Sequence, residues 1–375
     1  MSNLASPPSN FSSSEGGNLN NSDINEILAA AFDAHNSNDM ELAESLYRRC
    51  LELSPDNPKA LHNLGVIGLQ TGNIDAAIKL IRHALKNDPN FVDGYCNLGL
   101  ALKTAGHYDI AEETYRKAIS IDPNAVEAHS NLGILFQEMA LSDAAHRSFK
   151  TALQLAPGRG DLWSNLAVLN MQLGNKNEAV EQFVEASKRN PENPEILSNL
   201  GSALTQVDKP EEALSFLKRA LRLDPNFIEG HYNLGKTFFD LGELDKAVFH
   251  YRFALKLEEG FPDAHHNLGH ALLALGNLEE GWVEYGWRWK SKKFTKDLPE
   301  FSKPLWAGER LTDSVVFIWS EQGIGDQILF GGLIPELEKL SKACIVETES
   351  RLVPLFARSF PASKVVEKNE DDERG

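Results

Sequence analysis

The feature that most constrains the fold of this chain is a repeat with an unvarying period of 34 residues. The tripeptide Asn-Leu-Gly, which is Asn-Leu-Ala in one case, begins at Asn63, Asn97, Asn131, Asn165, Asn199, Asn233 and Asn267. A fixed period of about 20 to 50 residues is typical of solenoids, in which each repeat buries its apolar face against its neighbours. The period therefore predicts a solenoid.

Each period also places small residues and a proline at fixed positions. Alanine follows the tripeptide glycine at two fixed distances, and in five periods a proline follows the second alanine, as at Ala77, Ala84 and Pro89. Proline lacks an N–H and has a fixed φ, so it ends one helix and sets the turn to the next. We expect two antiparallel helices per repeat, packed through small residues and an aromatic side chain. The turn between them should contain Gly72, Gly106, Gly174, Gly242 and Gly276.

This pattern resembles the tetratricopeptide repeat in its leucine, glycine, two alanines, aromatic residue and closing proline. Counting back one period predicts a first, degenerate repeat from about residue 24, with Ala31, Ala43, Tyr47 and Cys50 in the corresponding places. Counting forward predicts an eighth repeat from about residue 262. The resemblance implies an all-α superhelical solenoid of about eight repeats over residues 23–290. After the solenoid we expect a partial α/β Rossmann-like domain, because the periodicity changes in the last part of the chain.

Composition narrows the classes of partner. A formal charge of −17 argues against nucleic acid and anionic lipid, because both need clustered Lys and Arg. No apolar run approaches the length of a membrane span. Three widely separated cysteines, Cys50, Cys96 and Cys344, favour a reducing compartment, so we expect a cytoplasmic protein. Residues 1–22 are rich in Ser, Asn, Gly and Pro, which is typical of a disordered leader.

The asparagines of the seven tripeptides are candidate peptide-binding residues. The first helix of each repeat lines the concave side of such a solenoid, so side chains at one repeat position form a ladder there. A carboxamide offers two donors and an acceptor, which match the peptide unit. The repeats look like those of O-linked N-acetylglucosamine transferase, and this resemblance implies that the ladder holds the backbone of an extended polypeptide. In the alternative interpretation, each asparagine bonds to the backbone of the neighbouring helix.

Two further sets of residues follow from the same repeats. The positions one residue before the asparagines should decide specificity, and they hold His62, Cys96, Ser130, Ser164, Ser198, Tyr232 and His266. His265, His266 and His270 cluster in the sequence, and two of them have the spacing of ligands on one helix face. No zinc-protease glutamate and no third ligand accompany them, so we expect no metal site.

In the last part of the chain the helical repeat gives way to a pattern of alternating strands and helices. After an irregular connector at residues 291–311, an apolar run at residues 315–319 predicts a buried parallel strand. An amphipathic stretch at 327–342, two more apolar runs and a helix at 351–359 continue a β-α-β-α-β order, which predicts half of a doubly wound sheet over residues 312–367. Residues 368–375 are almost wholly charged and should form a solvated tail. Gly323 and Gly325 form a candidate ligand loop after the first strand, although their match to the dinucleotide fingerprint is weak.

A second resemblance concerns about residues 282–366. Trp287-Arg288-Trp289, Trp306-Ala307-Gly308, the hexapeptide at 321–326 and Pro335 look like bacterial proteins that fuse tetratricopeptide repeats to a heptosyltransferase-like glycosyltransferase. That family has a GT-B architecture, and the resemblance implies that Asp326 is the general base that deprotonates an acceptor hydroxyl. In the competing interpretation, Asp326 is the N-cap of the following helix. A complete GT-B enzyme also needs a second half that binds a nucleotide-sugar donor, and this chain shows no such half.

Two functions remain from the sequence. The first is a binding module that holds a protein or an extended peptide and needs no cofactor. The second is a glycosyltransferase that acts on a protein acceptor, with a nucleotide-sugar donor, and is complete only in a longer form. Whether the chain itself is an enzyme stays open at this point.

Overall fold

The computed structural model describes residues 21–291, 303–306, 308–309, 311–320 and 323–368. The chain divides into two compact units, residues 1–288 and 289–375, and each is described by itself. Nearly all of the expected leader, most of the expected connector and all but the first residue of the expected charged tail lie outside the described residues. The domain boundaries given above therefore stay predictions.

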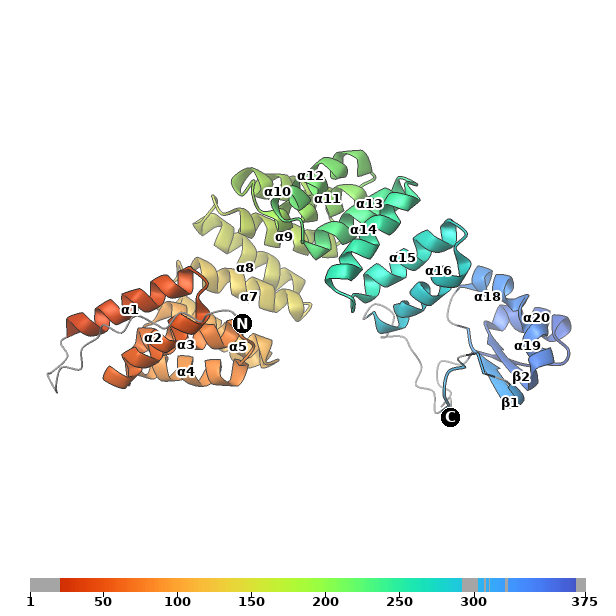
Figure 1. Ribbon diagram of the computed structural model, residues 1–375, viewed down its shortest axis with the longest axis horizontal. Helices are drawn as coiled ribbons and strands as arrows, with labels where there is room; N and C mark the ends of the chain where they lie inside the picture. The colour runs from red at the N-terminus through yellow and green to blue at the C-terminus, as the bar shows by residue number, and fades with distance from the viewer. Residues whose placement is uncertain (1–20, 292–302, 307, 310, 321–322, 369–375) are drawn as a thin grey trace, which may run out of the picture. The chain divides into compact units, whose positions relative to one another are not determined.

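The first unit consists of eight antiparallel helix pairs within its described residues (Figure 1). First helices of consecutive pairs contact each other from α3 through α15, so they form one continuous layer. The first helices are α1 Asn21–Asn36, α3 Pro58–Gln70, α5 Val92–Thr104, α7 Val126–Glu138, α9 Gly160–Gln172, α11 Pro194–Gln206, α13 Ile228–Asp240 and α15 Pro262–Ala274. The second helices are α2 Met40–Leu53, α4 Ile74–Asn87, α6 Tyr108–Ile121, α8 Ser142–Leu155, α10 Lys176–Arg189, α12 Pro210–Leu223, α14 Leu244–Leu257 and α16 Leu278–Tyr285.

The turn inside each pair contains one residue in the left-handed region of φ. The five expected glycines occupy it, with φ between 74° and 83°. In the other three repeats the same position holds Asn38, Ala140 and Asp208, with φ of 61°, 58° and 63°. Asn and Asp tolerate this conformation through local hydrogen bonds, whereas alanine has no such compensation. The turn geometry is therefore kept even where glycine is absent.

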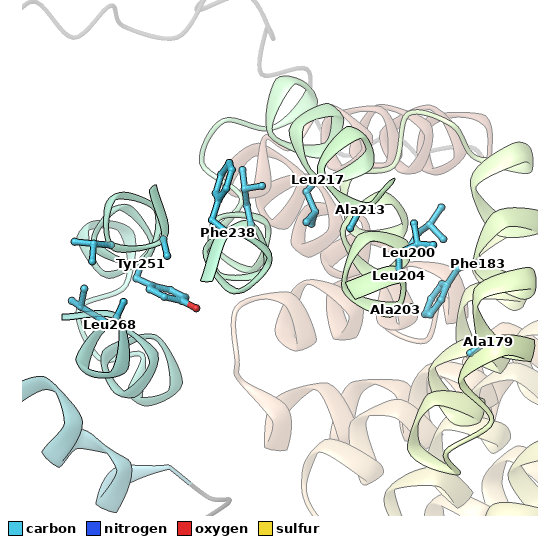
Figure 2. Packing of buried hydrophobic residues seen from close by; sticks show 14 of the residues in the cluster. Ala179, Phe183, Leu200, Ala203, Leu204, Ala213, Leu217, Phe238, Tyr251 and Leu268 are labelled. Carbon is cyan, nitrogen blue, oxygen red and sulfur yellow. The ribbon is translucent and has the colours of Figure 1, made fainter. Parts of the chain in front are cut away.

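The seam between the two helices of a pair is made as the sequence predicts. The first alanine of each second helix, from Ala77 to Ala247, is completely buried, and so is the second, from Ala84 to Ala254. A Cβ atom added to Gly99 would lie 2.4 Å from Tyr115, and one added to Gly133 would lie 2.6 Å from Phe149. Glycine therefore makes room for the ring in these two repeats, whereas in the repeat with Ala167 the alanine is completely buried in the same cluster as Phe183. Figure 2 shows this packing continuing from Ala179 and Phe183 to Tyr251 and Leu268.

The two end repeats keep the seam with different details. The degenerate first repeat is confirmed, because Ala31, Ala43, Tyr47 and Cys50 are all completely buried. In the eighth repeat α16 has only 8 residues and is followed by a 3₁₀ helix, η1 Gly286–Lys290. There a Cβ on Gly269 would lie 2.4 Å from the backbone nitrogen of Tyr285. The last pair is thus the one in which backbone itself fills the glycine position.

The second unit contains a three-stranded parallel sheet in the order β1-β2-β3. Helices α18 Ile324–Gly331, α19 Ile334–Leu340 and α20 Val353–Ser359 connect the strands, together with η2 Ser350–Leu352 (Figure 1). The strands are β1 Leu311–Ile318, β2 Ser341–Thr348 and β3 Lys364–Glu367. The predicted order of strands and helices is confirmed, and a complete Rossmann-like half stays a prediction.

One expectation for this unit is wrong. The stretch at 327–342 is not a single helix, because α18 ends at Gly331, α19 begins at Ile334, and β2 already starts at Ser341. Glycine at positions 331 and 332 and a proline in the first turn of α19 favour a break at this point. Ile334, Cys344, Val346 and Phe356 form the buried core beside the sheet.

Candidate functional site: the groove of the first helices

A cavity of about 740 Å³ lies along the first helices of the first four repeats. Its apolar lining includes Leu28 and Phe32 of α1 and Phe91 at the start of α5. Its polar lining includes Asn63, Asn97 and Asn131, which come from α3, α5 and α7. Every residue that lines it belongs to a first helix or to the residue just before one. The structure thus places three of the predicted asparagines on a hollowed surface that also has an exposed Phe32 and the half-buried Leu28 and Phe91.

Four of the seven asparagines link neighbouring repeats. Each donates a carboxamide N–H to the side chain that stands 35 residues earlier, in the position just before the previous asparagine. The pairs are Asn97 to His62 Nε2 at 2.9 Å, Asn165 to Ser130 Oγ at 3.4 Å, Asn233 to Ser198 Oγ at 3.0 Å and Asn267 to Tyr232 Oη at 3.0 Å. The partner is therefore a side chain and not the helix backbone that the alternative interpretation expected. We call these bonds the inter-repeat clips.

The clip at His62 also fixes the protonation of its ring. His62 Nδ1 lies 3.0 Å from Asn63 Oδ1, an acceptor, so Nδ1 carries the proton. Nε2 is then the acceptor for Asn97. Burial lowers the pKa of His62 and keeps the ring neutral, as this pair of bonds requires.

Asn131 and Asn199 differ from the other five asparagines. Their carboxamides make no hydrogen bond within the described part of the chain, although both side chains are half-buried. Each therefore offers two donors and one acceptor to a ligand. Asn131 lines the cavity of about 740 Å³, whereas Asn199 lines neither this cavity nor the smaller one described next.

A second, smaller cavity of about 240 Å³ lies further along the same layer of helices. Asn267 and His270 of α15 line it together with Lys236 and Asp240 of α13. Burial raises the pKa of Asp240, with Lys236 opposing the effect. Burial lowers the pKa of His270, and the positive charge of Arg288 lowers it further. Charged side chains thus line both cavities, Lys59, Asp93 and Glu127 the first and Lys236 and Asp240 the second.

The histidines of the last repeats have structural partners. His265 Nε2 bonds to the carbonyl oxygen of Glu259 at 2.8 Å, Nδ1 contacts the Glu284 carboxylate, and the ring stacks on Trp287. His266 and His270 lie side by side, with their Nε2 atoms 3.2 Å apart. Among the described residues, no three His, Cys, Asp or Glu side chains form a group that could hold a metal ion.

Sequence reasoning missed one recurrent polar contact. His129, Trp163 and His231 each direct a ring nitrogen at the carbonyl oxygen of the proline six residues earlier, at 3.0 to 3.1 Å. His265 makes the same contact with Glu259. The sequence does contain a signal for this contact, because an aromatic or histidine ring recurs two residues before the asparagine in these four repeats. These bonds hold the start of α7, α9, α13 and α15 against the preceding turn.

The candidate residues of the second unit lie at the start of α18. Gly323 is the N-cap residue, Gly325 lies in the first turn, and the backbone nitrogen of Asp326 donates to Gly323 O at 3.1 Å. Asp326 is thus the third residue of the helix and not its N-cap. Next to it, Gln327 Oε1 accepts from Thr348 Oγ1 at 2.7 Å and from the backbone nitrogen of Glu349 at 3.2 Å, at the carboxyl end of β2.

Comparison with known families decides the class of the first unit. The model of a protein family described as the C-terminal domain of cilia and flagella-associated protein 70, a tetratricopeptide-repeat domain, matches residues 19–272. The chain belongs to this tetratricopeptide-repeat family. The resemblance stated from the repeat positions is therefore confirmed for the solenoid.

Solved tetratricopeptide-repeat structures agree with this fold. The APC/C hetero-tetramer Cut9-Hcn1 superposes with a TM-score of 0.59 at 18% identity, over 72% of this chain and 54% of that chain. A tetratricopeptide repeat protein from Parabacteroides merdae superposes with a TM-score of 0.53 at 17% identity, over 67% of this chain and 99% of that chain. At these identities the similarity concerns the fold alone.

One curated relative is similar over a shorter stretch. Protein FlbA of Caulobacter vibrioides is 34% identical over 93 residues, which are 23% of this chain and only 16% of FlbA. In the described part of this tetratricopeptide-repeat chain, no helix is both long and apolar enough to cross a membrane.

Proposed function

We propose that this protein is a protein-interaction module whose first helices bind an extended segment of a partner polypeptide. The observation that carries the proposal is the cavity of about 740 Å³, in which the free carboxamide of Asn131 stands beside Leu28, Phe32 and Phe91. Such a surface offers main-chain hydrogen bonds and an apolar seat for a side chain, the combination by which extended peptides are recognised.

The inter-repeat clips support this proposal by fixing the geometry of the ladder. In the clipped asparagines one N–H is held by the previous repeat, so the second N–H and Oδ1 remain for a ligand. Asn131 keeps both N–H groups and Oδ1. A peptide lying along α3, α5 and α7 would then meet a row of amide groups at the spacing of the repeats.

A structural relative gives the proposal context. The superposable Cut9 chain was solved as a hetero-tetramer with Hcn1, so a solenoid of this fold occurs within a protein assembly. On the cysteine pattern and the absence of an apolar run in the sequence, we place the protein in the cytoplasm.

The experiment compares Asn131→Ala with Asn199→Ala. Both residues hold the same repeat position and lack a hydrogen bond, and only Asn131 lines the cavity. The probe is the set of 12-residue peptides that the wild-type chain selects from a phage-displayed library. We expect Asn131→Ala to weaken their binding by about 1 kcal/mol, the usual contribution of one hydrogen bond, and Asn199→Ala to leave it unchanged.

Two results would overturn the proposal. One is a library from which the wild-type chain enriches no peptide. The other is an Asn131→Ala variant that stays folded and binds the selected peptides as tightly as the wild type.

A second candidate function concerns the other unit. The position of Asp326 in the first turn of α18, directly after the loop that follows β1, is compatible with a carboxylate that receives a proton from an acceptor hydroxyl. Glycosyl transfer would then need a donor-binding half and a nucleotide-sugar supplied by a longer form. In such a form Asp326→Asn should abolish transfer, and retained transfer would rule out Asp326 as the base.

A further inference from the structure

A stripe of carboxylates runs beside the asparagine ladder. Six consecutive first helices carry an acidic residue four positions before their asparagine, which is one helical turn away on the same face. Asp93 and Glu127 line the cavity of about 740 Å³ together with Asn97 and Asn131. We call these residues the acidic stripe: Asp93, Glu127, Asp161, Glu195, Glu229 and Asp263.

The helix dipole explains only part of this pattern. Each residue of the acidic stripe is the second residue of its helix, where a negative charge is favourable. The same second position is acidic in second helices too, at Asp75, Asp109, Asp143, Glu211 and Asp245. The dipole therefore accounts for the charge on both sets of helices, but it does not determine what each set faces. The second set provides a matched control.

The chain itself shows how the acidic stripe receives a cation. Arg159 donates to Glu127 Oε1 at 2.6 Å and to Asp161 Oδ2 at 2.5 Å, so one guanidinium bridges the carboxylates of two neighbouring repeats. The two carboxylates raise the pKa of Arg159. One basic side chain thus fits between consecutive members of the acidic stripe.

In the other repeats the residue at the position of Arg159 is not basic. Arg159 is the residue just before α9, and the same place holds Asn57, Phe91, Ala125, Asn193, Phe227 and Phe261 in the neighbouring repeats. Within the described residues, Asp93, Glu195 and Glu229 have no ion-pair partner. These three carboxylates therefore carry negative charge that no ion pair compensates, and Phe91 lines the same cavity as Asp93, together with the basic Lys59.

We propose that the partner segment is basic, and that its Arg or Lys side chains bind between carboxylates of neighbouring repeats as Arg159 does. This inference rests on the proposed peptide-binding function and names the chemistry of the peptide. The backbone lies along the carboxamides, while basic side chains reach the acidic stripe one helical turn away. The formal charge of −17 increases the rate at which such a segment is captured.

The test uses four labelled peptides with one backbone, in which Ser alternates with Arg, Lys, citrulline or Glu over 12 residues. Citrulline has the shape of arginine without its charge. We expect the Arg and Lys peptides to bind, the citrulline peptide to bind at least tenfold more weakly, and the Glu peptide not to bind. Raising the salt concentration should weaken the Arg peptide most.

Variants then locate the binding. Asp93→Asn/Glu195→Gln/Glu229→Gln should weaken the Arg peptide about eightfold, since three exposed ion pairs contribute roughly twofold each. The control Asp109→Asn/Glu211→Gln/Asp245→Asn removes equal charge at the same helix position on second helices, and it should leave binding within about twofold.

The outcomes separate this inference from the proposed function. Equal weakening by the two triple variants would show attraction to net charge alone and would overturn the inference. Equal binding of the Arg and citrulline peptides, with weakening by Asn131→Ala, would also overturn it and leave the groove function intact. If the library yields no binding peptide of any charge, the proposed function fails as well.

Discussion

The two sides of the first helices use the same period in different ways. On the side that faces the second helix, every complete repeat has a small residue at the same positions, and Leu64, Leu132 and Leu200 are buried alike. On the groove side, asparagines at one repeat position clip two repeats together, bond within their own helix or stay free. The seam tolerates little variation because side-chain atoms of the second helix, and in the eighth repeat its backbone, lie close to the glycine positions, whereas the groove differs from repeat to repeat. The packing of the helix pairs is thus the same in each repeat, whereas the groups offered to a ligand differ between repeats.

The largest effect should come from adding a methyl group to the seam. Gly269→Ala places a Cβ 2.4 Å from the backbone nitrogen of Tyr285, which has no side-chain rotation to relieve the clash. We expect a loss of about 3 kcal/mol in the free energy of unfolding, at the upper end for overpacking. Urea unfolding measures it. Gly286→Ala, where a Cβ meets nothing within 4 Å, is the control, and equal stability of the two variants would contradict the account.

A smaller effect of opposite sign is expected at the turn of the fourth repeat. Ala140 has a φ of 58°, where five other repeats have glycine. Ala140→Gly should stabilise the protein by about 1 kcal/mol, because glycine removes the strain of a Cβ in the left-handed region. Thermal unfolding of this variant beside Gly106→Ala, which should lose a similar amount, tests the idea. A destabilised Ala140→Gly variant would refute it.

These two positions also show what the sequence could predict. Glycines, alanines and prolines recur at fixed positions of the period, so the helix pairs, the seam and the degenerate first repeat followed from sequence alone. Whether Asn131 is free and Asn233 is clipped did not follow, since the difference depends on the side chain 35 residues earlier, Cys96 or Ser198, and on local distance. The acidic residues of the stripe are also visible in the sequence, but the helix dipole alone can explain them. Only the lining of the cavity shows that those of the first helices, such as Asp93 and Glu127, lie in the groove.

The division between clipped and free asparagines predicts unequal effects on stability. Asn233→Ala removes a bond of 3.0 Å to Ser198, a residue that is 1% exposed, and should cost about 1 kcal/mol. Asn199→Ala removes no internal bond and should cost less than about 0.5 kcal/mol. Paired urea titrations measure the difference. If both variants lose the same stability, the clips do not hold the repeats together.

Acidic pH should weaken the solenoid modestly through the buried His62 and the half-buried His250. Burial lowers the pKa of His62, and burial followed by the charges of His231 and Lys218 lowers that of His250 to about 4. The unfolded chain binds these protons from about pH 6.5 downward, so stability is complete above that pH and falls below it. The melting temperature should drop between pH 7.5 and 5. His250→Gln should flatten the drop, and an unchanged pH profile in that variant would exclude His250 as a cause.

The most direct measurement of the central claim is photo-crosslinking of a bound peptide. A photoreactive amino acid replaces either Asn131, in the groove of the first helices, or Asp143, near the start of the second helix α8. With the alternating Arg-Ser peptide, the account predicts a crosslinked product from position 131 and none from position 143. Crosslinking from position 143 with none from position 131 would contradict it.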